Sequence, residues 1–123
     1  MLASGEHSRG PLPVILLGST GSIGTQARDV IDAHSGRFHV VGVSAGGSSI
    51  EVLAEQIVAL APAFVGVARD VREELVAAVR ALGGQCPQLF VGEQASVDVV
   101  RASVERARED YPGLVPVVLN GIT

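Results

Sequence analysis

Three glycines spaced by three residues, directly after an apolar run, are the strongest structural constraint in this sequence. The apolar run is Val14–Leu17, and the glycines are Gly18, Gly21 and Gly24. Apolar residues then recur at helical spacing over Ile23–Ile31, which predicts an amphipathic helix. A buried strand, a glycine turn and a helix in this order are typical of the first half of a dinucleotide-binding βαβ unit.

Each part of this turn has a physical purpose. A residue without a Cβ, as at Gly18 and Gly21, allows a tight turn and lets the backbone approach a pyrophosphate. The unpaired amides and the positive dipole end of the following helix favour phosphate groups. Thr20 and Ser22 add hydroxyl donors at the same place, and Gly24 lets the helix pack closely on the strand. The turn is therefore a candidate phosphate site.

Strand and helix patterns alternate along the rest of the chain. Further strands are expected over residues 38–44, 63–68, 89–91 and 115–119, and helices over residues 48–60, 70–82 and 93–109. Short turns between alternating strands and helices predict a parallel sheet with right-handed crossovers. We therefore expect an α/β fold, namely a Rossmann-like parallel sheet with helices on both faces.

Several residues predict where helices begin and end. Ser48 and Glu51 have the spacing of a capping box, which favours a helix start. Gly36 and Gly83 each follow a helical pattern. Both glycines are suited to the left-handed position that ends a helix.

Length and composition limit the class of protein. The 123 residues suffice for one domain with a core, and we expect a flexible leader over residues 1–12 before a domain over residues 13–123. The arginines are scattered, lysine is absent and only 3% of residues are aromatic, which disfavours nucleic-acid binding. The sequence has no membrane-length apolar run, no signal peptide and one cysteine, so we expect a cytoplasmic protein that does not enter a membrane.

The segment after the predicted second strand favours NADP over NAD. NAD sites usually place a carboxylate at this strand end to bind the ribose 2′-hydroxyl, whereas the first acidic residue here is Glu51. Gly46, Gly47, Ser48 and Ser49 instead offer backbone amides, hydroxyls and a helix start, all of which suit an anion. The same residues would also be expected in a simple turn with a helix cap.

The stretch Leu17–Gln26 resembles the opening of the 1-deoxy-D-xylulose 5-phosphate reductoisomerase family. The resemblance extends to Asp29–Ile31, Arg37–Gly42, Ala45–Gly46 and Val118–Asn120. The resemblance covers nearly the whole chain after the leader and implies the nucleotide-binding domain of that family. One departure is that the family often has Lys-Asn after the glycine that matches Gly46, whereas Gly47–Ser49 here carries no positive charge.

The resemblance implies a cofactor and the residues that hold it. Thr20, Gly21, Ser22 and Ile23 would contact NADPH, and Gly46–Ser49 would lie near the adenosine 2′-phosphate. The family converts 1-deoxy-D-xylulose 5-phosphate to 2-C-methyl-D-erythritol 4-phosphate by isomerisation and NADPH-dependent reduction. This reaction of non-mevalonate isoprenoid biosynthesis uses a divalent metal, Mg²⁺ or Mn²⁺, whose ligands lie in a region that this chain does not contain.

The chain ends in Asn120–Thr123, which is typical of a ligand loop after a strand. We therefore expect a fragment of a longer, homodimeric enzyme that is inactive alone. No residue is assigned a catalytic or metal-binding role, because Asp29 and Asp32 have the pattern of exposed helix acids and Cys86 has no neighbouring base.

Other functions remain open at this point. A non-catalytic NAD(P)-sensing domain would show the same glycine turn. Extended short-chain dehydrogenases share the pattern but need a Tyr-x-x-x-Lys pair, and Tyr111 is followed by Val115 at that spacing. Semialdehyde or acyl-phosphate reductases need a catalytic cysteine in a later strand–helix turn, which Cys86 before a proline does not fit.

Overall fold

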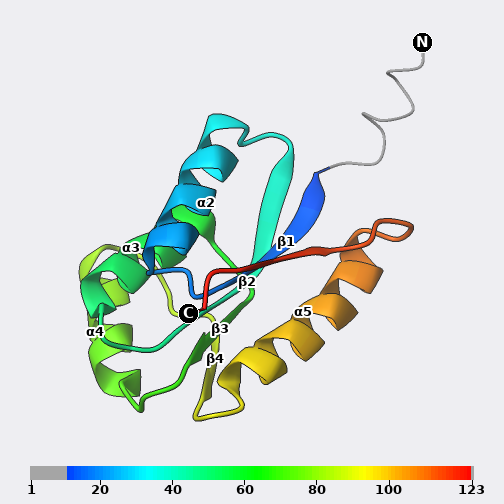
Figure 1. Cartoon of the computed structure of the whole chain (residues 1–123). Coiled ribbons are helices and arrows are strands. Elements are labelled where there is room, and N and C mark those ends of the chain that lie inside the picture. The colour runs from blue at the N-terminus through cyan, green and yellow to red at the C-terminus, as the bar shows by residue number, and fades with distance from the viewer. Residues whose placement is uncertain (1–10, 123) are drawn as a thin grey trace.

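All five strands of the computed structural model run parallel in one sheet (Figure 1). The model describes residues 11–122. Along the chain the elements are β1 (Leu12–Leu17), α2 (Ser22–Ala33), β2 (Phe38–Ala45), α3 (Ile50–Leu60), β3 (Phe64–Val67), α4 (Arg72–Ala81), β4 (Gln88–Val91), α5 (Ala95–Asp110) and β5 (Val117–Asn120). The sheet order is β4-β3-β2-β1-β5, so the predicted Rossmann-like α/β fold is confirmed.

The helices divide unequally between the two faces of the sheet (Figure 1). Three of them, α2, α3 and α4, cover one face, where Ile31, Leu53 and Leu75 pack on strand residues such as Leu16 and Val43. Only α5 covers the opposite face in the part of the chain that the structure describes. Helices on both faces, as the alternating pattern predicted, thus produce a core in two layers.

Two strand glycines let α5 lie unusually close to the sheet. A Cβ on Gly66 would come within 2.8 Å of a Val99 methyl group and 2.9 Å of the Ala95 carbonyl oxygen. A Cβ on Gly42 would collide with the Ser103 side chain. The close approach of α5 therefore depends on having glycine at position 42 on β2 and at position 66 on β3.

The chain reverses its direction of travel across the sheet at β1. From β1 it proceeds outward through β2, β3 and β4, and α5 then carries it back to β5 on the other side of β1. Residues Leu17 and Asn120 are register partners at the carboxyl ends of β1 and β5. In open parallel sheets, ligands bind at such a reversal, outside the carboxyl ends of the strands.

The boundaries of the first strand and helix differ from the expectation. The strand begins at Leu12, two residues before the predicted start, and residues 1–10 of the predicted leader lie outside the described residues. Helix α2 ends at Ala33, and the next residue, His34, donates its amide to the Ile31 carbonyl at 3.1 Å. The prediction for Gly36 is therefore wrong, because the helix ends before this residue, which does not adopt a left-handed conformation.

The apolar face of α2 is also rotated from the expected one. Ile23 and Val30 are 54% and 57% exposed, whereas Gly24 and Ile31 are buried and Ala27 packs on the core. The missing side chain of Gly24 allows the backbone of α2 to approach the glycine turn, so this face of the helix turns inward. The close packing predicted for Gly24 thus holds, but the hydrophobic pattern did not show that Ile23 and Val30 lie outside the buried face.

One predicted helix end is confirmed and one predicted cap is wrong. Gly83 has φ +86° and, with Gly84, donates its amide to carbonyls in the last turn of α4, which satisfies groups that a helix end leaves unpaired. The capping box of Ser48 and Glu51 does not form. The residue that precedes α3 is Ser49, and no side-chain hydrogen bond caps the helix.

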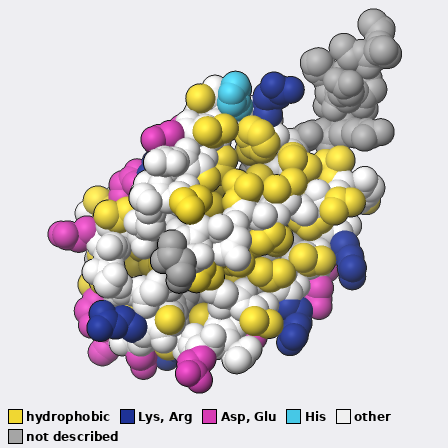
Figure 2. Space-filling view, in the orientation of Figure 1, with side chains coloured by type: hydrophobic (Ala, Val, Ile, Leu, Met, Phe, Trp, Pro, Cys, Tyr) yellow, Lys and Arg dark blue, Asp and Glu magenta, His cyan; other side chains and the backbone are white. Residues whose placement is uncertain are grey.

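The outer edge of the sheet at β5 is apolar, and no other strand within residues 11–122 pairs with it. Figure 2 shows hydrophobic side chains gathered on the face that carries β5. Val115, Val117 and Val118 are 80%, 36% and 44% exposed. No helix of residues 11–122 is long and apolar enough to cross a membrane.

Replacing Gly66 with alanine tests the close packing of α5. The added Cβ meets a backbone carbonyl that cannot rotate away, so we expect Gly66→Ala to lower the free energy of unfolding by about 1 to 3 kcal/mol. Gly36→Ala is the matched control, because a Cβ at Gly36 meets nothing within 4 Å. Urea unfolding monitored by circular dichroism measures both. Equal stability of the two variants would contradict the packing role of Gly66.

Candidate nucleotide site

Three loops meet at the carboxyl edge of the sheet, beside the reversal at β1. The loop after β1 contains the glycine turn, and the loops after β2 and β5 flank it. Ser19 donates its amide to the Ser44 carbonyl at 2.9 Å, and Gly121 donates its amide to the Leu17 carbonyl at 2.7 Å. Backbone hydrogen bonds therefore hold the glycine turn between its two neighbours.

Two glycines of the turn are required by the chain's own packing. Gly18 has φ +69°, and a Cβ there would lie 2.7 Å from the Gly121 carbonyl carbon. A Cβ on Gly24 would lie 2.7 Å from the Ser19 Cα atom. Both contacts are with backbone, which cannot move aside as a flexible side chain could. Gly18 and Gly24 thus permit β1, α2 and the loop after β5 to converge.

Gly21 differs from the other two glycines. Its φ of −77° is open to any residue, and a Cβ would meet its nearest neighbour, the Gly18 carbonyl oxygen, at an ordinary 3.5 Å. Gly21 is also exposed. Neither the conformation nor the packing of this chain requires a glycine here. The absence of a side chain at Gly21 therefore leaves space for a group outside the chain.

The start of α2 presents unpaired polar groups at this position. Gly21 precedes the helix without a side-chain cap, and the first turn contains no acidic residue. Thr20 is half-buried and Ser22 exposed, and neither hydroxyl forms a hydrogen bond within residues 11–122. Ile23, another predicted contact residue, is exposed beside them. The structure thus brings the predicted residues of the glycine turn together on one exposed helix start.

The predicted second cluster lies in the loop between β2 and α3. Gly46 and Ser48 are exposed, Ser49 is half-buried, and Gly47 is buried with φ +105°. Gly46 accepts a backbone hydrogen bond of 3.1 Å from Arg69, which follows β3. This loop adjoins the glycine turn because β1 and β2 are neighbours and their carboxyl ends share one edge.

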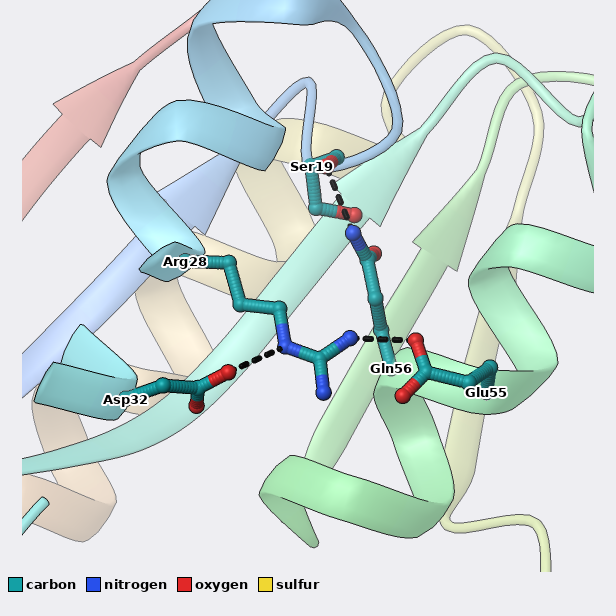
Figure 3. Close-up of polar contacts among 5 residues, drawn as sticks. All are labelled: Ser19, Arg28, Asp32, Glu55 and Gln56. Carbon is teal, nitrogen blue, oxygen red and sulfur yellow. Dashed lines mark hydrogen bonds and ion pairs between the residues drawn. The ribbon is translucent and has the colours of Figure 1, made fainter. Parts of the chain in front are cut away.

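Gln56 is a site residue that the sequence analysis missed. Its side chain is 1% exposed, and its Nε2 atom donates to the Ser19 carbonyl oxygen at 2.8 Å. Figure 3 shows the side chains of Ser19 and Gln56 facing one another. The Ser19 hydroxyl and the Gln56 Oε1 atom are buried without a partner among residues 11–122. A glutamine on the apolar face of a predicted helix was the signal, since a buried amide needs a partner.

Arg28 joins the two helices that carry the site. It forms an ion pair with Asp32 on α2 at 3.1 Å and another with Glu55 on α3 (Figure 3). The hydrogen bond to Glu55 raises the pKa of Arg28, and the hydrogen bond from Arg28 lowers the pKa of Glu55. Asp32, interpreted from the sequence as an exposed helix acid, is thus a partner in this structural pair.

The described residues offer no metal site. No group of three or more His, Cys, Asp or Glu side chains within residues 11–122 is arranged to hold a metal ion. The Cys86 thiol is half-buried, and burial raises its pKa. A raised pKa keeps the thiol protonated and weakens it as a nucleophile.

Comparison with known proteins places the chain in a family. The family model described as 1-deoxy-D-xylulose 5-phosphate reductoisomerase matches residues 14–118. Proteins of that name are similar to this chain in Beutenbergia cavernae (46% identity, 89% of this chain and 25% of the relative) and Mycolicibacterium smegmatis (47% identity, 80% and 24%). The chain spans about a quarter of the length of these relatives.

Solved structures agree with the fold. One is 1-deoxy-D-xylulose 5-phosphate reductoisomerase from Zymomonas mobilis in complex with NADPH, with a TM-score of 0.59 and 27% identity over 72% of this chain and 23% of that one. Another is DOX-P reductoisomerase in complex with NADPH, fosmidomycin and magnesium, with a TM-score of 0.70 and 19% identity. It covers 90% of this chain and 24% of that chain.

The role of Gln56 can be tested by removing its donor. Gln56→Met keeps the approximate volume but leaves the buried Ser19 carbonyl without its side-chain partner. We expect the free energy of unfolding to fall by about 1 to 2 kcal/mol, with faster amide hydrogen exchange in the glycine turn. Gln26→Met, at an exposed position on α2, is the control. Unchanged exchange in the turn would contradict the positioning role of Gln56.

The ion pair of Arg28 and Glu55 predicts a small, pH-dependent contribution to stability. A carboxyl with a lowered pKa stabilises the fold above its ordinary pKa, and this contribution is lost as the pH falls through the lowered value. Because Glu55 is 52% exposed, we expect Glu55→Gln to cost about 1 kcal/mol or less near neutral pH.

Urea unfolding near neutral pH and in acid measures this difference, with the exposed Glu105→Gln on α5 as control. The gap between Glu55→Gln and the unsubstituted chain should close in acid. A gap that persists where Glu55 is protonated would contradict an ionic origin.

Proposed function

Because this chain belongs to the 1-deoxy-D-xylulose 5-phosphate reductoisomerase family, we propose that it is an NADPH-binding domain of such an enzyme. The observation that supports this most directly is Gly21, whose missing side chain serves neither conformation nor packing within the chain. It lies at the uncapped start of α2, on the edge of the sheet where nucleotides bind in folds of this kind.

The glycine turn would hold the pyrophosphate of the cofactor. The amides at the start of α2 would donate hydrogen bonds to phosphate oxygens, and the positive end of the helix dipole would stabilise their charge. Thr20 and Ser22 have hydroxyls that are not used by described residues, and these could add further donors. Ile23, exposed beside them, would provide an apolar contact for the cofactor.

The loop over residues 46–49 would receive the adenosine end of the cofactor. It carries no acidic side chain that would repel a 2′-phosphate. The α3 start is not capped by a side chain, so its amides are available to an anion. These features support NADPH rather than NADH as the preferred nucleotide.

We propose that the complete enzyme isomerises and reduces 1-deoxy-D-xylulose 5-phosphate to 2-C-methyl-D-erythritol 4-phosphate. The cofactor would supply the hydride, and this chain would bind and orient it. Residues 11–122 contain no set of ligands for the divalent metal that the reaction needs, so we expect this chain to be inactive by itself. A cytoplasmic homodimer is the form we propose for the complete enzyme.

Replacing Gly21 with alanine separates nucleotide binding from folding. The fold accepts the added Cβ, but the methyl group would occupy the space through which a pyrophosphate approaches the backbone. In calorimetric titrations we expect NADPH to bind Gly21→Ala at least about tenfold more weakly than the unsubstituted chain. The urea midpoint should remain unchanged.

Two results would contradict the proposed function. One is a folded chain, by circular dichroism, that binds neither NADPH nor NADH. The other is a Gly21→Ala variant that retains full affinity for NADPH. Catalytic turnover by this chain alone would instead overturn the expectation that the catalytic residues lie elsewhere.

A further inference from the structure

We propose that Arg69 supplies the positive charge that recognises the 2′-phosphate of NADPH. This inference rests on the proposed function, because it assigns a specificity-determining residue to the same nucleotide site. Arg69 lies in the loop after β3, at least twenty positions along the chain from the loop over residues 46–49. The two loops meet because β2 and β3 are neighbouring parallel strands, with Ala45 and Val67 in register at their carboxyl ends.

Arg69 is held beside the loop over residues 46–49 by its backbone, and its side chain lies next to Gly47. Its amide donates to the Gly46 carbonyl at 3.1 Å. A Cβ built on Gly47 would lie 3.2 Å from the Arg69 Cβ atom and 3.7 Å from its Cδ atom. The aliphatic part of the Arg69 side chain therefore passes over Gly47 and begins its reach toward solvent from there. The small size of Gly47 makes room for it.

The charge of Arg69 is available to a ligand. The residue is exposed, and its guanidinium forms no ion pair with another residue in the described range 11–122. By contrast, Arg28, which is also near the site, is already bound to two carboxylates. Arg69 is thus a basic side chain beside this loop that no carboxylate of residues 11–122 neutralises.

A phosphate at this loop needs such a charge. Ser48, Ser49 and the first amides of α3 offer only neutral donors, whereas a phosphomonoester carries close to two negative charges near neutral pH. Two nearby carboxylates, Glu51 in the first turn of α3 and Asp70 next to Arg69, would repel it. A guanidinium can offset this repulsion and bind two phosphate oxygens at once through its planar set of donors.

The substitution Arg69→Gln tests this assignment without disturbing the fold. It removes the charge but keeps the backbone amide that bonds to Gly46. Arg72→Gln is the matched control, because Arg72 lines a different hollow, together with Cys86 and Leu89. Titrations of the unsubstituted chain and both variants use NADPH, NADH, adenosine 2′,5′-bisphosphate and adenosine 5′-monophosphate.

We expect Arg69→Gln to weaken binding of NADPH and of adenosine 2′,5′-bisphosphate by about tenfold, the size of one charge-assisted hydrogen bond. Binding of the two probes without a 2′-phosphate should change by less than about twofold. Arg69→Lys should retain part of the preference, because it keeps the charge but not the planar donors. Arg72→Gln should bind all four probes as the unsubstituted chain does.

Three results would overturn the assignment. The first is an unchanged ratio of NADPH to NADH affinity in Arg69→Gln, which would leave the proposed function intact but remove Arg69 from recognition. The second is an equal loss of all four probes, which would indicate a general effect on the loop. The third is a folded, unsubstituted chain that binds no nucleotide, which would remove the proposed function together with the role of Arg69.

Discussion

The crossing of three backbone segments beneath the glycine turn is the contact on which the rest of the structure depends. Gly18, Gly24 and Gly121 approach so closely that main-chain atoms occupy the space of a side chain. This crossing fixes where α2 begins relative to β1 and where β5 ends beside them. The uncapped start of α2 therefore has a defined position, exposed at the carboxyl edge of the sheet.

Polar contacts hold this arrangement from the side of α3. Gln56 reaches through the core to the Ser19 carbonyl, and Arg28 links α2 to Glu55 on the surface. The buried contact should contribute more, because an unsatisfied carbonyl in the core loses water as well as its partner, whereas an exposed ion pair is screened. The glycine turn is thus positioned by a buried amide and only assisted by charge.

The loops at the carboxyl edge of the sheet illustrate two different uses of glycine. At Gly18 and Gly24 the missing Cβ allows the chain to pack on itself, and at Gly21 it leaves space for something else. Gly47 makes room for the stem of Arg69, so that a side chain from the loop after β3 lies against the loop over residues 46–49.

The sequence by itself determined the order of strands and helices, the glycine turn and the helix end at Gly83, because these depend on apolar periodicity and on local backbone freedom. It did not determine which face of α2 is buried, and the predictions for Gly36 and for the Ser48 cap failed, since packing decides where a helix turns inward and stops. Tertiary structure alone brought Gln56 to the glycine turn and Arg69 to the loop after β2. Those contacts join residues far apart in the chain, and only the pairing of parallel strands, which places their carboxyl ends on one edge, makes them neighbours.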